Sequence, residues 1–417
     1  MVPPWTLAAP IAMLCGVALA GCGSSSSGLV VKTVSEYGGT PIAGVQVQVE
    51  EQPWQTTGSG GEASFTATKA PYVVRVYQPM TFTTLQGVRR QHDKVWQLVG
   101  QSANPLVLDV DGSLSQIYKA RVSGTVTGRS AAGTQVAVGA PVPFAAAADG
   151  SFQLPVVWWE GSTSRNILLR AFESDTSQPP GHYLRFGAAS VKVTDETGFL
   201  GPGGNVAGAS VPLTPVAEGH VSGNVTGAAA ATLRSALALQ FGKYDWLGLG
   251  EGSTSGLPLA FDYALPLVAG GTPWIQFTAS SGSGFLGTSY TWHDRAVTPP
   301  ATGVSFDLPA SVSLLEPADS ASFSSSTVFR WNAGPAGGKY ALDLSCADWN
   351  EGPLTRNIHY RAVETTTASV ALPAIPGVAI PAGTSCSWSV QWTATTDPLS
   401  ETRGSQSAAR ATIASGT

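Results

Sequence analysis

The sequence predicts an all-β protein made of tandem β-sandwiches. Short runs of β-branched and aromatic residues recur at intervals of about ten, and Gly, Pro, Ser and Asp separate them. Val45–Val49 and Val73–Tyr77 alternate apolar and polar residues, which is the period of a strand with one buried face. Hydrophobic residues make up 43% of the chain, which is enough to fill several cores.

Composition excludes several other classes of protein. Only 12% of the residues are charged, and Lys and Glu, which favour helices, are scarce. The 48 Gly and 29 Pro exceed average usage without reaching the low-complexity range. A collagen, a coiled coil, a helical bundle and a charged disordered chain are therefore excluded. A net charge of −5 gives no basic surface for nucleic acid, so no nucleic-acid partner is expected.

Two alanine-rich segments are the only candidates for other structure. Ala145–Ala148 is interpreted as a loop, and Ala228–Leu239 as a short helix candidate. Apart from these, no stretch shows a helical period.

The N-terminus predicts export. Residues 2–21 carry no charge, and Leu7–Gly21 is apolar and small. A spanning helix needs about 20 apolar residues, so this segment fits a signal peptide over residues 1–21 better. Residues 22–28, with four consecutive Ser, are expected to form a flexible tether.

Leu19-Ala20-Gly21-Cys22 resembles the lipobox of bacterial lipoproteins. The resemblance implies that Cys22 becomes the first residue and carries lipid, which would anchor the protein at about 0.8 kcal/mol per buried methylene. Gly23 after the Cys, where Asp would favour another destination, implies the outer membrane of a Gram-negative bacterium. The alternative is an ordinary secretory signal, and the lack of Lys or Arg before Lys32 departs from the usual positive n-region.

The four cysteines leave one pair for the exported part. Cys15 lies in the signal and Cys22 is the lipidation candidate, so Cys346 and Cys386 remain. In an oxidising compartment they are expected to form a disulfide, worth about 3–4 kcal/mol for a loop of about 40 residues. Two free thiols or a metal site are the alternatives, although no further Cys or His stands at a zinc spacing.

An internal repeat indicates duplicated domains. Val122–Gly128 closely matches Val221–Gly227, 99 residues further on. Phe152–Val157 likewise parallels Tyr263–Val268. A shared order of strand, turn and strand in two blocks of about a hundred residues predicts tandem copies of one fold. The predicted β-sandwich domains cover residues 29–115, 116–215, 216–310 and 311–417.

The first block resembles the carboxypeptidase regulatory-like domain, which is a transthyretin-like β-sandwich. The matching segments are Gly39–Val47, Thr57–Phe65 and Pro71–Val76. Asp149–Phe152 repeats the turn and the Phe in the second block. The resemblance concerns the accessory domain only, because the zinc-binding residues of carboxypeptidases have no counterpart here.

The C-terminal block resembles a fibronectin type III or immunoglobulin-like sandwich. The pattern lies in Phe329–Trp331, Tyr340–Leu344 and Ser387–Trp392. The resemblance implies that Trp331 and Trp388 belong to the core, and that the two cysteines lie near the ends of adjacent strands. Ala409–Ile413 is the expected last strand.

The sequence offers no catalytic, cofactor-binding or metal-binding motif. The His residues lie far apart and form no zinc pattern: His92, His182, His220, His293 and His359. His92-Asp93 and His293-Asp294 are neighbours, and neighbours on a strand point to opposite faces, so neither pair forms a dyad. Gly252–Gly256 has Thr where a nucleophile elbow has Ser. Asp109–Gly112 is too short for a calcium loop and is interpreted as a turn.

Aromatic residues give the ligand candidates. Trp158 and Trp159 are neighbours, so on a strand one of them faces away from the core. Trp246 stands beside a Gly-rich segment that is interpreted as a loop. These rings are candidates for stacking on sugars or docking a protein, and packing between neighbouring domains is the alternative.

Together these features predict a non-catalytic surface lipoprotein that acts as a stalk or as a display or adhesion module. Its expected partners are the membrane, through the lipid anchor, and a protein or polysaccharide. Two alternatives remain: a polysaccharide-binding protein that uses Trp158, Trp159 or Trp246, and an enzyme with an unfamiliar site.

Overall fold

The computed structural model describes most of the chain, and every regular element in the described part is a strand. The described ranges are residues 28–35, 39–83, 87–110, 117–130, 135–139, 143–159, 164–175, 182–195, 204–227, 232–242, 245–254, 256–281, 289–324, 326–375, 377–397 and 401–413. The protein is therefore all-β, as predicted.

The first block forms two facing sheets. Its strands are β1 (Leu29–Ser35), β2 (Gln46–Val49), β3 (Gln55–Thr56), β4 (Glu62–Phe65), β5 (Tyr72–Thr83), β6 (Arg89–Gln101) and β7 (Leu106–Val110). One sheet has the order β4-β1-β7, with β1 antiparallel to β4 and parallel to β7. The other runs β3-β2-β5-β6, antiparallel throughout.

The second and third blocks repeat this topology. The second has β8 (Ile117–Thr127), β9 (Gln135–Gly139), β10 (Pro143–Ala145), β11 (Ser151–Trp159), β12 (Ser164–Asp175), β13 (His182–Thr194), β14 (Gly204–Pro212) and the short β15 (Thr214–Pro215). The third has β16 (Glu218–Gly227), β17 (Thr232–Gly242), β18 (Asp245–Thr254), β19 (Leu259–Pro266), β20 (Thr272–Ser281), β21 (Ser289–Ala296) and β22 (Ala301–Leu308). The orders β11-β8-β14 and β19-β16-β22 correspond to β4-β1-β7, including the parallel third strand.

The repeated sequence has a structural cause in this topology. Gly124 and Gly223 occupy equivalent places in β8 and β16, where the parallel ladder to β14 or β22 shifts register. A Cβ would lie 2.0 Å from the carbonyl oxygen of Ala209 at Gly124, and 1.8 Å from that of Val304 at Gly223. Only glycine allows the neighbouring backbone to approach this closely.

The C-terminal block has a different strand order. Its strands are β23 (Leu314–Glu316), β24 (Ala321–Phe323), β25 (Val328–Trp331), β26 (Lys339–Glu351), β27 (Leu354–Thr365), β28 (Ser369–Ala371), β29 (Ser385–Asp397) and β30 (Glu401–Ile413). The sheet β23-β25-β28 faces β27-β26-β29-β30, and β24 pairs in parallel with β30. Trp331 and Trp388 lie in the core between these sheets, as predicted. β30 contains the predicted strand Ala409–Ile413 but begins at Glu401, earlier than expected.

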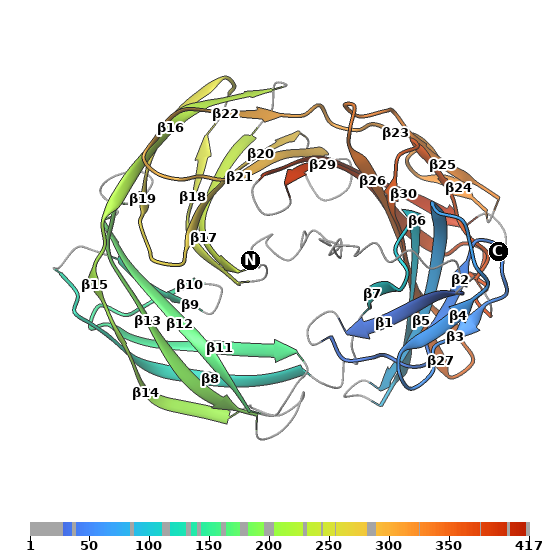
Figure 1. Cartoon of the computed structure of the whole chain (residues 1–417), viewed down its shortest axis with the longest axis horizontal. Helices are drawn as coiled ribbons and strands as arrows, with labels where there is room; N and C mark the ends of the chain where they lie inside the picture. The colour runs from blue at the N-terminus through green and yellow to red at the C-terminus, as the bar shows by residue number, and fades with distance from the viewer. Residues whose placement is uncertain are drawn as a thin grey trace, which may run out of the picture.

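One sheet continues through three blocks. β21 pairs with β30, which joins the third block to the C-terminal block, and β27 pairs in parallel with β6, which joins the C-terminal block to the first. The result is a single sheet of 13 strands. In Figure 1 the chain follows an arc whose last part returns to its first. Backbone ladders therefore link these blocks edge to edge.

The first and C-terminal blocks place their cores on opposite faces of the shared sheet. Val95 of β6 belongs to the core cluster of the C-terminal block, whereas Leu98 of the same strand belongs to that of the first block. Side chains three residues apart on a strand point to opposite faces, which explains how β6 serves both cores.

The predicted helix candidate at Ala228–Leu239 was wrong over its described part. Residues from Thr232 onward form β17, and Leu233, Leu237 and Leu239 all point into the core of the third block. These even spacings match the two-residue period of a strand. Residues 228–231 lie outside the described part of the chain.

Candidate functional site

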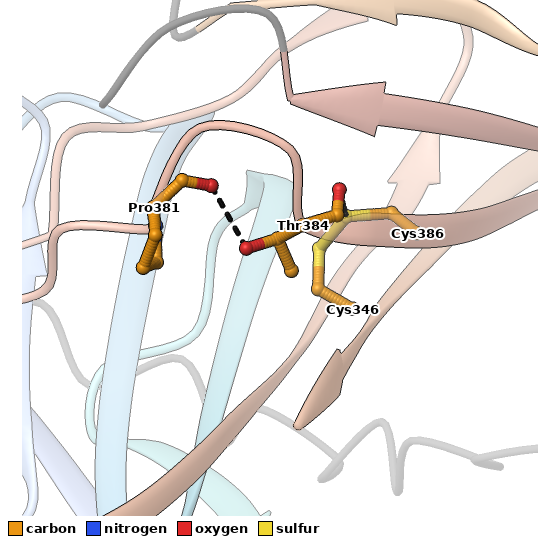
Figure 2. Close-up of a disulfide and its surroundings, with 4 residues drawn as sticks. All are labelled: Cys346, Pro381, Thr384 and Cys386. Carbon is orange, nitrogen blue, oxygen red and sulfur yellow. Dashed lines mark hydrogen bonds between the residues drawn. A yellow bond between two sulfur atoms is a disulfide. The ribbon is translucent and has the colours of Figure 1, made fainter. Parts of the chain in front are cut away.

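The predicted disulfide is present in the C-terminal block. Cys346 on β26 and Cys386 on β29 lie opposite each other in the ladder, with Cα atoms 3.9 Å apart, and their sulfurs are bonded. Figure 2 shows the bond beside the turn that enters β29, where the hydroxyl of Thr384 donates to the carbonyl of Pro381 at 2.8 Å. The bond links adjacent strands of one sheet, as predicted. It closes the segment between Cys346 and Cys386 into a loop.

The junction between β6 and β27 contains a buried ion pair. Asp93 on β6 is completely buried, and Arg356 on β27 is 5% exposed. The guanidinium donates to Asp93 Oδ2 from Nε at 3.0 Å and from Nη2 at 2.8 Å. Two charge-assisted bonds to one carboxylate oxygen, both from a buried guanidinium, thus link the first block to the C-terminal block.

Neighbouring groups satisfy the rest of this ion pair. Tyr77 donates to Asp93 Oδ1 at 2.9 Å, and the Gln91 amide donates to the same oxygen at 2.6 Å. Arg356 Nη1 donates to Glu351 Oε2 at 2.5 Å. Burial, with the charge of Asp93 as a further cause, raises the pKa of Tyr77 well above its ordinary value, so the phenol remains a donor.

A second polar cluster covers the opposite face of the same junction. His92 Nδ1 contacts the side-chain oxygen Oδ1 of Asn357, and the Asn357 side-chain amide donates from Nδ2 to Asp348 Oδ1 at 2.8 Å. Arg90 pairs with the other oxygen of Asp348, also at 2.8 Å. Since these contacts link β6 to the C-terminal block as well, both faces of the parallel ladder are held by polar side chains.

The position of His92 makes the stability of this junction depend on pH. Burial lowers the pKa of His92, and the nearby charges of Lys94 and His359 lower it further, against the opposing effects of Asn357 and Asp93. A lowered pKa means that the unfolded chain binds the proton more readily than the folded one. The contribution of His92 to stability is therefore complete above about pH 6.5 and is lost as the pH falls below that value.

We expect acidification from pH 7.5 to 5 to destabilise the wild-type protein more than His92→Gln. The measurement is the free energy of unfolding in urea at several pH values. His220→Gln provides a matched control, because it makes the same substitution on β16 of the third block, away from this junction. A constant difference between wild type and His92→Gln over this range would contradict the assignment.

Sequence reasoning missed this junction, although a signal was present. Asp93 lies two residues before Val95, and Arg356 lies two and four residues before Ile358 and Tyr360. On a strand, each charged side chain therefore points to the same face as these apolar residues. A charge at a core-facing position of an alternating strand requires a buried partner. The pattern does not reveal which of the other charged residues provides it.

A second ion pair joins the second and third blocks. Arg170 on β12 is 4% exposed and makes two bonds of 2.6 Å with the carboxylate of Asp245 on β18. Its guanidinium also lies 3.8 Å from the ring centroid of Phe241 on β17. Phe186 of the second block stacks on the same Phe241 at 6.2 Å. The arrangement fixes these two blocks against each other.

The three Trp candidates for ligand stacking have different outcomes. Trp158 is buried and stacks on Tyr118 inside the core of the second block, so it is not a ligand platform. Trp246 lies on strand β18, not in a loop, and packs edge-on against Trp274 at 5.1 Å. Trp159 is the last residue of β11, and its side chain lies outside the described part of the structure.

The remaining His residues are dispersed. Each of four has a partner of its own: His182 Nδ1 with Glu218 at 3.0 Å, His220 with Asp262 at 3.2 Å, His359 with Asp343 at 3.2 Å, and His293 Nδ1, which accepts from the backbone N–H of Asp307 at 2.9 Å. Among the described residues, no three His, Cys, Asp or Glu side chains group as metal ligands would.

Several predicted features lie outside the described residues. These are the signal peptide over residues 1–21, Cys15, the lipidation candidate Cys22 and the tether up to residue 27. Of Asp109–Gly112, Asp109 and Val110 end β7 and the other two residues are not described. The described ranges contain no helix that is apolar and long enough to span a membrane.

Comparison with known proteins finds distant structural similarity only. No family model matches the chain, and no curated protein matches its sequence. A leucine-rich repeat protein from Bacteroides thetaiotaomicron has 14% identity and a TM-score of 0.17; the match covers 47% of this chain and 26% of the other. This chain thus spans about a quarter of that protein.

Two further similar structures are those of a pilin and of part of an adhesion protein. A streptococcal ancillary pilin has 8% identity and a TM-score of 0.15, with 68% of this chain and 98% of the other covered. A tetra-tandem repeat from the extending region of a large adhesion protein has 11% identity and a TM-score of 0.14, with 93% and 99% covered. TM-scores this low do not assign a shared fold.

Proposed function

We propose that this protein is a non-catalytic surface lipoprotein, anchored through Cys22 to the outer membrane of a Gram-negative bacterium. In this proposal it serves as a rigid structural, display or adhesion module. The first three blocks are transthyretin-like sandwiches related to the carboxypeptidase regulatory-like domain, since they share one strand order. The C-terminal block is of the fibronectin type III or immunoglobulin-like type, supported by its sheets β23-β25-β28 and β27-β26-β29-β30.

The observation that carries the proposal is that two buried arginines form ion pairs between blocks. Arg356–Asp93 and Arg170–Asp245 are the ion pairs with the least exposed arginines among the described residues, and each joins one block to another. In an enzyme, buried ionisable groups are typically arranged around a cleft for proton transfer or nucleophilic attack. Here they immobilise blocks, which suits a protein that must hold a surface in a fixed shape.

The rigidity has a direct consequence for the anchored protein. β1 begins at Leu29, so the tether enters the first block, and the first block is linked to the C-terminal block by β6 and β27. Both blocks would therefore lie near the membrane, and the second and third blocks would form the rest of the arc. A lipid anchor with this geometry presents a broad surface, not the tip of a rod.

Metabolic labelling tests the anchor. We expect cells fed an alkyne-labelled fatty acid to incorporate it into the wild-type protein and not into Cys22→Ala, and globomycin to cause accumulation of the unprocessed form. Cys15→Ala serves as the matched control and should be labelled like wild type. Equal labelling of wild type and Cys22→Ala, or none of either, would refute lipidation at this residue.

A further inference from the structure

Among the described residues, no buried core cluster covers one face of the large sheet in the third and C-terminal blocks. Phe277 of β20 and His293 of β21 lie opposite each other and are buried, so the residues of opposite parity lie on the other face. On that face Thr278 lies opposite Trp292, and Tyr290 lies opposite Gln406 of β30. In Figure 1 this sheet follows the inner side of the arc, with β16 and β22 outside it. We call this the Trp292 face.

The Trp292 face combines half-buried aromatic rings with uncharged polar groups. Tyr290 and Trp292 are two residues apart on β21, and neither is fully buried. Most side chains around them are amides and hydroxyls: Gln276, Thr278, Ser280, Gln391 and Gln406. Asp294, which lies opposite Gln276, is a charged neighbour. The Gln406 amide donates to Ser389 at 3.3 Å and the Gln391 amide to Thr393 at 3.4 Å, which orients these groups along the sheet.

The face continues without a break across two blocks. β21 pairs with β30, β30 with β29 and β29 with β26, so the polar rows of the third block run into those of the C-terminal block. Charged side chains border this region: Asp294 lies two residues after Trp292 on β21, and the exposed Arg234 lies opposite Thr278 on β17. On β26 Asp343 is paired with His359 at 3.2 Å and Arg361 at 3.5 Å. The uncharged part thus runs from Trp292 across β30 and β29 to β26, which suits an extended ligand.

We propose that the Trp292 face binds a neutral polysaccharide chain. Aromatic faces stack on the apolar faces of sugar rings, while amides and hydroxyls exchange hydrogen bonds with sugar hydroxyls. A nucleic acid would require a basic surface, whereas on this face Trp292 has the carboxylate of Asp294 beside it and a single Arg, Arg234, two strands away. A protein partner would require an apolar centre. The large apolar side chains that are exposed in the described residues lie elsewhere, outside β20, β21, β29 and β30: Val88, Val107, Phe144, Val157, Leu168, Leu267 and Leu315.

This inference rests on the proposed adhesion role and names the class of ligand that the protein would bind. The candidate residues lie on β21, and not on the strands of the Trp residues that the sequence suggested. Trp158 is buried, and Trp246 packs on Trp274, whereas Trp292 and Tyr290 share an open sheet face with polar neighbours. The sequence did not indicate them, because the ligand character of the face arises only when β21, β29 and β30 pair.

Affinity electrophoresis tests the proposal with the full chain carrying Cys22→Ser, so that the outcome is independent of the anchor. Native gels contain hydroxyethylcellulose, xylan, laminarin, galactomannan or dextran, and polygalacturonate serves as the charged comparison. We expect retardation by at least one neutral polymer and about tenfold weaker retardation of Trp292→Ala, equivalent to about 1.4 kcal/mol. Val157→Ala, an exposed apolar residue of the second block, should behave like wild type.

A second variant protects the test against misfolding. Gln406→Lys places a charge on the Trp292 face without changing a core residue, and it should also weaken retardation severalfold while its thermal unfolding stays that of wild type. The proposal is overturned if no neutral polymer retards the wild-type protein, if only polygalacturonate does, or if Trp292→Ala or a folded Gln406→Lys is retarded as strongly as wild type. Loss of lipid labelling at Cys22 with retained retardation would refute the anchor alone.

Discussion

Asp93→Asn is expected to lower the free energy of unfolding by about 3 kcal/mol, because it leaves the Arg356 guanidinium buried without its main counter-charge. Arg356 retains Glu351 at 2.5 Å, but that carboxylate is 58% exposed and compensates only in part. The measurement is urea unfolding followed by tryptophan fluorescence. Trp349, whose ring centroid lies 5.9 Å from the Arg356 guanidinium carbon, reports on the junction.

Two controls separate the buried pair from general damage. Asp348→Asn alters the pair with Arg90 on the same junction, whose side chains are about two-fifths exposed, and should cost less than about 1 kcal/mol. The double variant Asp93→Leu/Arg356→Met should recover much of the loss, since apolar residues of similar size remove the unpaired charge. An Asp93→Asn protein as stable as Asp348→Asn would show that the pair does not hold the blocks together.

Gly223→Ala is expected to destabilise the third block by about 3 kcal/mol, the upper end of the range for overpacking a core. The added methyl would lie 1.8 Å from the carbonyl oxygen and 2.7 Å from the carbonyl carbon of Val304, so the ladder between β16 and β22 must open. The three atoms nearest to the added methyl are all backbone atoms of Val304, so no flexible side chain can move aside. Thermal unfolding by circular dichroism measures the effect.

The repeat makes this prediction sharper. Gly124→Ala should cost a similar amount in the second block, because a Cβ there would lie 2.0 Å from the carbonyl oxygen of Ala209. Gly60→Ala is the control, since nothing lies within 4 Å of the position that its added methyl would occupy and its φ is not positive. Similar stability of Gly223→Ala and Gly60→Ala would mean that β16 and β22 are not packed as described.

Local sequence patterns were sufficient to predict the strands and the disulfide. Alternation in Val45–Val49 and Val73–Tyr77 is recovered in β2 and β5, and Cys346 and Cys386 are bonded across adjacent strands. The strands follow from the two-residue period, and the disulfide follows from the small number of cysteines. Both can be read from one amino-acid sequence. The boundaries proposed for the domains, and the roles of residues 1–27, stay predictions.

The linkage between blocks was not predictable in the same way. The pairing of β6 with β27 joins residues more than 250 positions apart, as the Arg356–Asp93 separation of 263 shows. The alternation of side chains does not indicate which strand will pair with an exposed edge, because every exposed edge offers the same N–H and C=O groups. The error about Trp158 has a similar cause: period two requires one of two neighbouring Trp to face outward but does not say which.

A rigid module requires above all that the first and C-terminal blocks form one body through β6 and β27. Double electron–electron resonance measures this with spin labels at Val107 on β7 and Leu315 on β23, which are 48% and 55% exposed, in the chain with Cys15→Ser and Cys22→Ser. We predict one narrow distance distribution, which broadens in Asp93→Asn. A broad distribution in the protein that retains Asp93 would show that the two blocks move independently and that the module is not rigid.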